Sequence, residues 1–277
     1  MLLRLGLRRG LPSRQLRRTL CLSLKGSDLP DGSAIDSLHA GCAGHAVPEL
    51  AAESPVTRNI DHLIECNKVW AEENKDWLNK HGGQHRPRYL WIGCSDARVP
   101  ANEIIGQPSG NVFVHRNVAN LVVPSDANFG SVLQYAVNVL RVPHIIVCGH
   151  YDCGGIKAAM SRITHDSRDL GSPLQDWLNN IRDVCRLHEH DLDAISDPDV
   201  KHRRLVELNV IEQCLNIFKT GVVQRRRLLT SKVPGAFPQP RVHGVVYNPK
   251  DGKLVKLDND FRKERARFGK IYDIFED

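Results

Sequence analysis

The sequence of 277 residues contains no apolar run approaching the roughly 18 residues that a membrane-spanning helix needs, so no membrane segment is expected. It also lacks an internal repeat. Of the 38 lysines and arginines, seven lie in residues 1–27 and 31 lie after them, against 32 acidic residues, all beyond residue 27. Because this balanced body is not a polycation, a nucleic acid partner is not expected either.

The acid-free segment, residues 1–27, is rich in Arg, Leu and Ser and is typical of an organelle transit peptide. A mitochondrial address is favoured over a chloroplast one because Arg outnumbers Ser and Thr; the alternative is a disordered basic tail. Residues 28–55 are rich in Gly, Ala, Ser, Asp and Pro and form a predicted linker, which leaves 56–277 as the folded domain. Both organelle interiors keep thiols reduced, so the eight cysteines indicate metal or packing roles.

Apolar runs typical of strands alternate with segments of helical period, which predicts a mainly parallel, doubly wound α/β sheet with right-handed crossovers. Strands are expected at 88–94, 111–116, 144–149, 240–247 and 253–258, and helices at 56–80, 129–140, 153–162, 172–190 and 200–230. The last two strands read as a hairpin. The expected strand order is 2-1-3-4 plus the C-terminal strand, flanked by helices.

Side chains with metal-binding chemistry follow the two most apolar strands. Cys94 ends the first strand, and His150 and Cys153 follow the third. In the expected order these strands are neighbours, and their carboxyl ends lie at one edge of the sheet, so two sulfurs and one imidazole should meet. Three protein ligands with one open position are typical of a catalytic zinc site, although either motif alone is more typical of packing. Cys148 is assigned to the core.

Three blocks of sequence resemble the signatures of β-class carbonic anhydrases, and the resemblance spans roughly residues 57–258. They are Cys94–Arg98, His115–Asn120 and Gly149–Gly155. The resemblance implies reversible hydration of carbon dioxide to bicarbonate and a proton by a hydroxide formed on zinc. It implies one Zn²⁺ per chain on Cys94, His150 and Cys153, with Asp96 and Arg98 as the catalytic dyad.

The dyad has a physical reason. Two thiolates cancel the charge of Zn²⁺, so the metal acidifies a water less than it would with three imidazoles, yet the pKa of that water must fall from about 16 towards roughly 7. The Arg98 cation and a partly dry pocket offset part of this deficit. Asp96 can accept the hydroxide's proton in a hydrogen bond, and Arg98 can hold the carboxylate. The alternative for the pair is a solvated salt bridge in a turn.

The resemblance also implies a substrate site. Phe113, Val118 and Tyr135 would form an apolar wall for the gas, and the backbone amide of Gly154 would donate to bicarbonate; the alternative for the three apolar residues is plain core. Many family members carry Gln nine residues before the first Cys ligand. This chain has His85 there, and Gln84 lies one residue further away.

One subset of the β class closes its site by making the Asp of the dyad a fourth zinc ligand, and carries a noncatalytic bicarbonate pocket. Trp91, Arg116 and Tyr247 stand at the matching positions, which implies that Asp96 can bind zinc and that bicarbonate regulates this chain. The alternative is that Trp91 and Tyr247 are ordinary sheet residues and Arg116 is a structural arginine.

The resemblance implies a homodimer or homotetramer in which the helix at 56–80 packs on the partner. Two rival functions remain: a carbon disulfide or carbonyl sulfide hydrolase on the same fold, and a structural zinc-binding module. Asp96 and Arg98 speak against the module, because a structural site closes with a fourth Cys or His. A further set of histidines is interpreted as a solvated helix face, with proton relay as the alternative: His188, His190 and His202.

Overall fold

The computed structural model describes residues 59–83, 85–164, 171–258, 269–272 and 274–275. The predicted transit peptide and linker lie outside the described residues. The chain divides into two compact units, residues 1–83 and 84–277. Within the described ranges, no helix combines the length and the hydropathy that crossing a membrane requires.

In the first unit, two helices replace the single helix expected at 56–80: α3 (Asp61–Glu73) and α4 (Lys75–His81). They meet at Asn74, whose side chain donates to the Trp70 carbonyl (2.7 Å) and so satisfies an acceptor at the end of α3. None of the residues of α3 is buried in the described part of the chain. The large apolar side chains of α3 and of its N-cap residue are about half exposed or more: Ile60, Leu63, Ile64, Val69 and Trp70.

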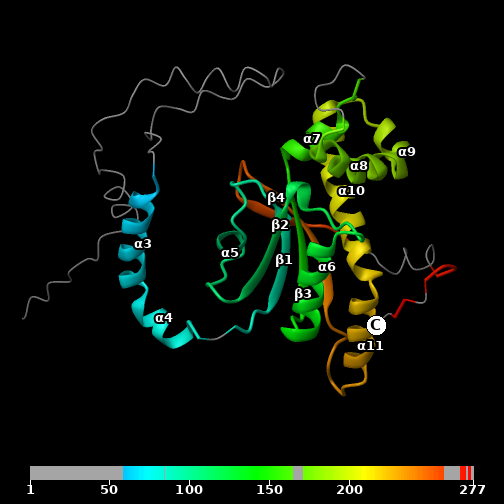
Figure 1. Ribbon diagram of the computed structural model, residues 1–277. Coiled ribbons are helices and arrows are strands. Elements are labelled where there is room, and N and C mark those ends of the chain that lie inside the picture. The colour runs from blue at the N-terminus through cyan, green and yellow to red at the C-terminus, as the bar shows by residue number, and fades with distance from the viewer. Residues whose placement is uncertain (1–58, 84, 165–170, 259–268, 273, 276–277) are drawn as a thin grey trace, which may run out of the picture. The chain divides into compact units, whose positions relative to one another are not determined.

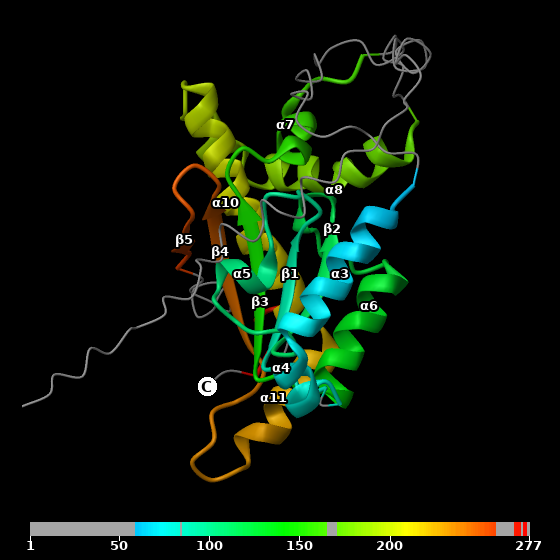
Figure 2. The same ribbon diagram turned by 90° about the vertical axis from the view of Figure 1, so that its left-hand side faces the viewer.

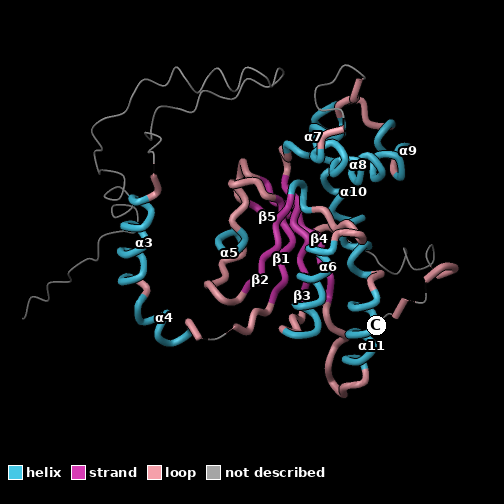
Figure 3. Tube along the Cα trace, in the orientation of Figure 1, coloured by secondary structure: helices cyan, strands magenta, loops and turns pink. Residues whose placement is uncertain are grey.

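A five-stranded sheet of order β2-β1-β3-β4-β5 forms the centre of the second unit, as predicted. Figure 2 shows the strands side by side, and Figure 3 shows them in magenta with helices in cyan beside them. The strands are β1 (Tyr89–Cys94), β2 (Val112–Asn117), β3 (His144–His150), β4 (Arg241–Asn248) and β5 (Lys253–Lys256). The first four are parallel, and β5 pairs antiparallel with β4 as the expected hairpin. Gly93 pairs with Cys148 across β1 and β3, so both strands end at the same edge of the sheet.

Helices cover both faces of this sheet. They are α5 (Ala101–Ile104), η2 (Val118–Asn120), α6 (Ala127–Gln134), η3 (Tyr135–Val139), α7 (Gly154–Met160), α8 (Pro173–Leu187), α9 (Glu189–Asp193), α10 (Pro198–Phe218) and α11 (Gly221–Ser231). Figures 1 and 2 show α6 and α10 on one side of the sheet and α5 on the other. Three expected helices are divided: 129–140 ends in the π-helical turn η3, 172–190 breaks at His188, and 200–230 breaks at Lys219–Thr220.

Alternation along β1 divides the interior into two clusters. Leu90 and Ile92 face the larger cluster, which α6, α8 and α10 complete. Trp91 faces a smaller cluster with Val99 and Cys148. Cys148 is fully buried, as expected of a core residue.

Candidate active site

Three ligand-type side chains converge at the edge where β1 and β3 end. Cys94 is the last residue of β1, His150 is the last of β3, and Cys153 immediately precedes α7. Their ligand atoms lie within 4.8 Å of one another, and the two Sγ atoms are 4.0 Å apart. Two sulfurs that bind one tetrahedral zinc at about 2.3 Å would be separated by about 3.8 Å, so the spacing fits that ion.

The His150 ring presents one nitrogen to this cluster. Its Nδ1 lies 3.0 Å from the Tyr151 carbonyl oxygen, which sets Nδ1 as the donor and leaves a lone pair on Nε2. His150 is completely buried, and Nε2 has no hydrogen-bond partner among the described residues. A buried acceptor without a donor is costly, and a metal ion removes that cost. The donor set therefore fits zinc.

The two thiols are hydrogen-bonded to each other. The hydrogen bond from Cys153 lowers the pKa of the Cys94 thiol to about 4, and the same bond raises the pKa of Cys153. Cys94 therefore loses its proton easily, whereas Cys153 does not, because ionisation of the second thiol would place two thiolates side by side. A bound divalent cation would take the place of the remaining proton and would stabilise both thiolates.

The Cys94 sulfur also accepts from the backbone N–H of Ala119 (3.4 Å). Ala119 and Asn120 both have left-handed backbone conformations, with φ of 63° and 50°, which non-glycine residues adopt only when their surroundings hold them. Buried carboxamides of α10 supply that support: Asn209 donates to the Ala119 carbonyl (3.2 Å), and Gln213 accepts from the backbone three residues further on (2.8 Å). Asn209 and Gln213 are four residues apart among the apolar positions of an amphipathic helix, and this spacing is the sequence signal that would have revealed them.

Asp96 lies beside the ligand cluster and is paired with Arg98. Arg98 Nε donates to Asp96 Oδ1 (3.0 Å), and Nη2 donates to Oδ2 (2.8 Å). These hydrogen bonds lower the pKa of Asp96 to about 2, so the carboxylate is ionised at neutral pH. Oδ2 is also 3.7 Å from His150 Nε2. The carboxylate therefore lies between the guanidinium and the cluster of ligand atoms.

The predicted substrate residues fall into two groups. The ring centroid of Phe113 lies 5.8 Å from that of Tyr135 and also 5.8 Å from that of His85. Val118 lies against Gly155 instead: a Cβ there would be 3.1 Å from Val118 Cγ1. Val118 and Tyr135 are 37% and 44% exposed, so neither is the plain core residue of the alternative interpretation. Gly154 begins α7, and Gln84 lies outside the described residues.

The predicted bicarbonate residues lie on the sheet face opposite the larger cluster. Trp91 and Tyr247 belong to the smaller cluster, and the Trp91 Nε1 is buried without a partner within the described part of the chain. Arg116 pairs with Gly93 in the sheet and donates from Nε to the Cys94 carbonyl (2.7 Å) and from Nη2 to the Asp96 carbonyl. Arg116 therefore holds the backbone of the loop that carries the candidate dyad.

Two of the three histidines that were expected on a solvated face are not there. His188 Nε2 lies 2.8 Å from Glu212, with both side chains largely buried. His202 Nε2 lies 3.3 Å from the Cys153 carbonyl and so supports the turn that carries a candidate ligand. His190 is exposed, as expected. Helical spacing alone does not distinguish these three environments.

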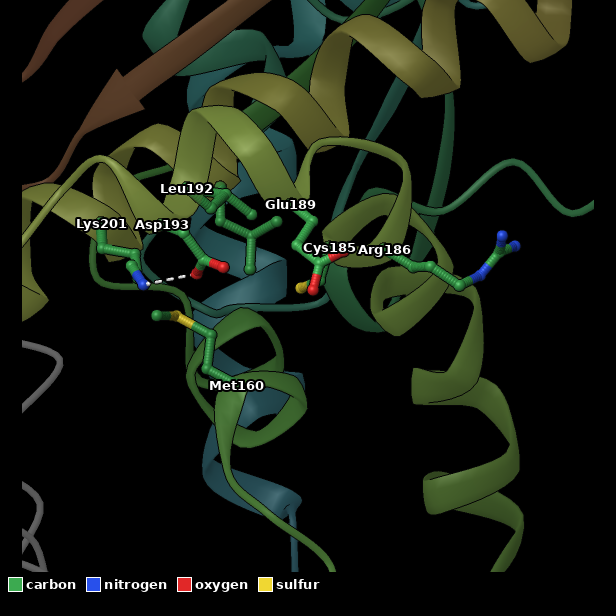
Figure 4. A pocket seen from close by; sticks show the side chains of 8 residues that line it. Met160, Cys185, Arg186, Glu189, Leu192, Asp193 and Lys201 are labelled. Carbon is green, nitrogen blue, oxygen red and sulfur yellow. Dashed lines mark hydrogen bonds and ion pairs between the residues drawn. The ribbon is translucent and has the colours of Figure 1, made fainter.

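A cavity of about 330 Å³ lies between α7, α8, α9 and α10 (Figure 4). Lys201 and Asp193 form an ion pair of 3.3 Å at its wall. Its lining is Met160, Cys185, Arg186, Glu189, Leu192, Asp193, Lys201 and Leu205. None of these is a predicted site residue, so the cavity is distinct from the candidate active site.

Fold and site together define a doubly wound α/β protein with a three-ligand zinc-type centre beside a carboxylate–guanidinium pair. Residues 89–254 match the family model described as carbonic anhydrase. A carbonic anhydrase of Emericella nidulans is 47% identical over 236 residues, which are 82% of this chain and 98% of that protein. A mitochondrial β-carbonic anhydrase of Arabidopsis thaliana is 31% identical over 173 residues, 61% of this chain and 56% of that protein.

Solved structures agree. A tetrameric β-carbonic anhydrase of Sordaria macrospora superposes with a TM-score of 0.63 and 33% identity, covering 72% of this chain and 96% of that one. A Coccomyxa β-carbonic anhydrase in complex with acetazolamide gives a TM-score of 0.66 and 32% identity, covering 76% and 92%. The chain belongs to the carbonic anhydrase family, in its β class.

Proposed function

We propose that the chain binds one zinc ion through Cys94, His150 and Cys153 and catalyses the reversible hydration of carbon dioxide to bicarbonate and a proton. The observation that carries this proposal is the convergence of two thiols and a buried, partnerless imidazole nitrogen within 4.8 Å, beside the Asp96–Arg98 pair. A structural zinc module has no use for such a pair. The position that the three ligands leave open suits catalysis.

Zinc, when bound, lowers the pKa of a water and supplies the nucleophile near neutral pH. The chain's own residues do the rest. Asp96, ionised, accepts a hydrogen bond from the attacking oxygen and directs its lone pair at carbon dioxide, while Arg98 fixes the carboxylate. Phe113, Val118 and Tyr135 hold the nonpolar gas, and the Gly154 amide donates to a bicarbonate oxygen.

The discriminating experiment compares substrates on the zinc-loaded chain. Stopped-flow measurement should show rapid carbon dioxide hydration that acetazolamide inhibits, with slow or no hydrolysis of carbonyl sulfide and carbon disulfide. Faster turnover of a sulfur substrate would assign the rival hydrolase. Stoichiometric zinc without any turnover would assign the structural module.

The second part of the proposal is regulation by bicarbonate at Trp91, Arg116 and Tyr247. In the closed form, Asp96 would leave Arg98 and would serve as the fourth ligand of the zinc ion, so that no position would remain for the reacting water. The hydrogen bonds of Arg116 with the carbonyls of Cys94 and Asp96 support a coupling between the two sites. An anion that binds Arg116 would weaken these hydrogen bonds and so change the position of the loop that carries Asp96. Bicarbonate then inhibits only by binding the closed form more tightly than the open one.

The third part is assembly as a homodimer or homotetramer. An exposed apolar stripe along α3 supports it: Ile60, Leu63, Ile64 and Trp70. Contiguous apolar side chains in contact with water are typical of a surface that binds another protein. The relative from Sordaria macrospora is tetrameric. Tyr135, a predicted substrate residue, and Val139 of the same helical turn are exposed apolar residues that also suit cover by a second copy of the chain.

The last part is a mitochondrial location directed by residues 1–27, with chloroplast import as the alternative. The acid-free, arginine-rich composition supports it, as does the mitochondrial relative of Arabidopsis thaliana. A fusion of residues 1–55 to a fluorescent protein should enter mitochondria and be shortened. A wholly cytosolic fusion would contradict the leader, whereas plastid import would correct only the organelle.

A further inference from the structure

The Arg98 guanidinium lies between two carboxylates, only one of which belongs to the dyad. On the far side from Asp96, Arg98 Nη1 donates to Asp152 Oδ2 (3.2 Å), and Nη2 donates to the Asp152 carbonyl oxygen (3.1 Å). Asp152 lies in the turn between His150 and Cys153. Arg98 therefore connects the loop after β1 to the turn after β3, the two segments that carry the candidate ligands.

The backbone of Asp152 is left-handed, with φ of 57°. Glycine takes this conformation without cost, and Asp tolerates it better than most residues but not freely. Glycine would therefore be the most favourable residue for the backbone conformation of this turn. An aspartate at this position, with both its carbonyl and its carboxylate on Arg98, indicates that the side chain has a role beyond forming the turn.

We propose that Asp152 is a positioning residue for the dyad: its carboxylate holds the Arg98 guanidinium where Asp96 binds it. This rests on the proposed function of Asp96 and Arg98. The Arg98 side chain is 49% exposed, and a long side chain so placed has many competing rotamers. A second carboxylate reduces that freedom before Asp96 binds. With Arg98 in place, Asp96 Oδ2 stays 2.8 Å from Nη2 instead of moving the short distance to the ligand cluster.

The Asp152 side chain is 66% exposed, so its direct attraction for Arg98 is weak, and the expected effect is modest. Asp152→Gly is the sharpest variant, because it keeps the turn and the backbone carbonyl and removes only the carboxylate. It should lower kcat/KM for hydration about two- to fivefold, with zinc content and Tm unchanged. Asp152→Asn, which tolerates the same backbone and keeps an oxygen acceptor, should fall between Asp152→Gly and wild type.

The matched control breaks another exposed pair outside the site: Asp191, 3.8 Å from Arg204. Asp191→Asn should leave kcat/KM unchanged. A second measurement does not depend on catalysis: the rate of Arg98 modification by phenylglyoxal, read by mass spectrometry in metal-free and zinc-loaded chain. It should rise about two- to fivefold in Asp152→Gly, while modification of the exposed Arg186 stays constant.

The two proposals fail in different ways. If wild type hydrates carbon dioxide but Asp152→Gly keeps full kcat/KM and an unchanged Arg98 labelling rate, Asp152 only forms the turn and the inference is overturned. If wild type shows no hydration, the proposed function fails, and the labelling rate alone then decides whether Asp152 holds Arg98.

Discussion

Two cysteines at the ends of neighbouring strands have opposite environments. Burial raises the pKa of Cys148, and the thiol donates to the adjacent Gly149 carbonyl, whereas Cys94 has a pKa lowered to about 4 and lies among candidate ligands. Cys94→Ala should therefore lose bound zinc and at least 100-fold of hydration activity, the size of effect typical when a catalytic group is removed. Zinc analysis and stopped-flow assays measure both losses.

His150→Ala and Cys153→Ala should show the same losses. Cys148→Ala is the matched control and should keep its zinc, at a cost in stability of about 1 kcal/mol for the lost buried sulfur. Full zinc together with normal turnover in the Cys94→Ala protein would refute the ligand assignment.

Trp91 offers a sharper test of bicarbonate regulation than truncation does. The side chain is fully buried, so Trp91→Ala would leave a cavity, whereas Trp91→Phe keeps most of the packing and removes only the partnerless Nε1–H. If that group donates to bicarbonate, Trp91→Phe should weaken bicarbonate inhibition about tenfold, the value of one hydrogen bond to an anion. The measurement is hydration rate against pH with and without added bicarbonate.

In wild type, added bicarbonate and low pH should act alike, because the open form is favoured by proton loss. Tyr247→Phe provides the comparison at the other side of the cluster and should weaken inhibition in the same direction. Identical bicarbonate inhibition in wild type and Trp91→Phe, or full wild-type activity well below pH 7, would rule out a closing switch at this pocket.

The convergence of Cys94, His150 and Cys153 was predictable because parallel strands end at one edge, and apolar runs mark where they end. The contact between Arg98 and Asp152, and the hydrogen bond from the Ala119 N–H to the Cys94 sulfur, could not be predicted from the sequence. Both depend on left-handed backbone at a non-glycine residue, and the Ala119 turn is also held by Asn209 of α10, which is distant in the sequence.

At the scale of elements, the strands were predictable to within one or two residues, whereas the long helices were not. The run 200–230 keeps its helical period, but the chain breaks it at Lys219–Thr220, where the Thr220 hydroxyl donates to the Ile217 carbonyl (2.7 Å). The π-helical turn at Tyr135–Val139 likewise leaves no trace in apolar spacing. Periodicity reports which face is buried, and it does not report where a helix changes direction.

One sheet element gives a pH prediction. His243 of β4 contacts His144 of β3 (3.1 Å between Nε2 and Nδ1), and they line a cavity of about 340 Å³. Burial first, and then the charges of His144, Lys256 and Arg241, lower the pKa of His243 from 6.5 to about 4. Between pH 6.5 and pH 4, His243 is protonated in the unfolded chain and neutral in the folded chain. The free energy of unfolding should therefore fall as pH drops from 6.5 towards 4, and this part of the loss should be complete below 4.

Solvent screening at this partly exposed site reduces the effect, which should be about 1 kcal/mol between pH 7 and pH 5. Urea unfolding of metal-free His243→Gln should show a correspondingly smaller pH dependence than wild type, because Gln does not titrate. His190→Gln, at an exposed histidine, should retain the wild-type dependence. A His243→Gln protein as acid-sensitive as wild type would show that the loss arises elsewhere.

For the whole molecule, the question is what covers α3. At 100° per residue, Ile60, Leu63, Ile64 and Trp70 fall on one side of the helix, and Val69 falls nearly opposite. Leu63 and Val69 are equally exposed, at 53% each. The same substitution, to Glu, can therefore be made on either side of the helix at positions that are equally exposed to solvent in the single chain.

If a second copy of the chain covers the stripe, Leu63→Glu forces a charge into the interface and should weaken association at least tenfold. Sedimentation velocity over a range of concentrations should then show a shift towards monomer, while Val69→Glu should sediment like wild type. Hydration activity should fall together with assembly, because apolar walls such as Tyr135 would lose their cover. Equal sedimentation of Leu63→Glu, Val69→Glu and wild type would exclude this stripe as the surface that joins the copies.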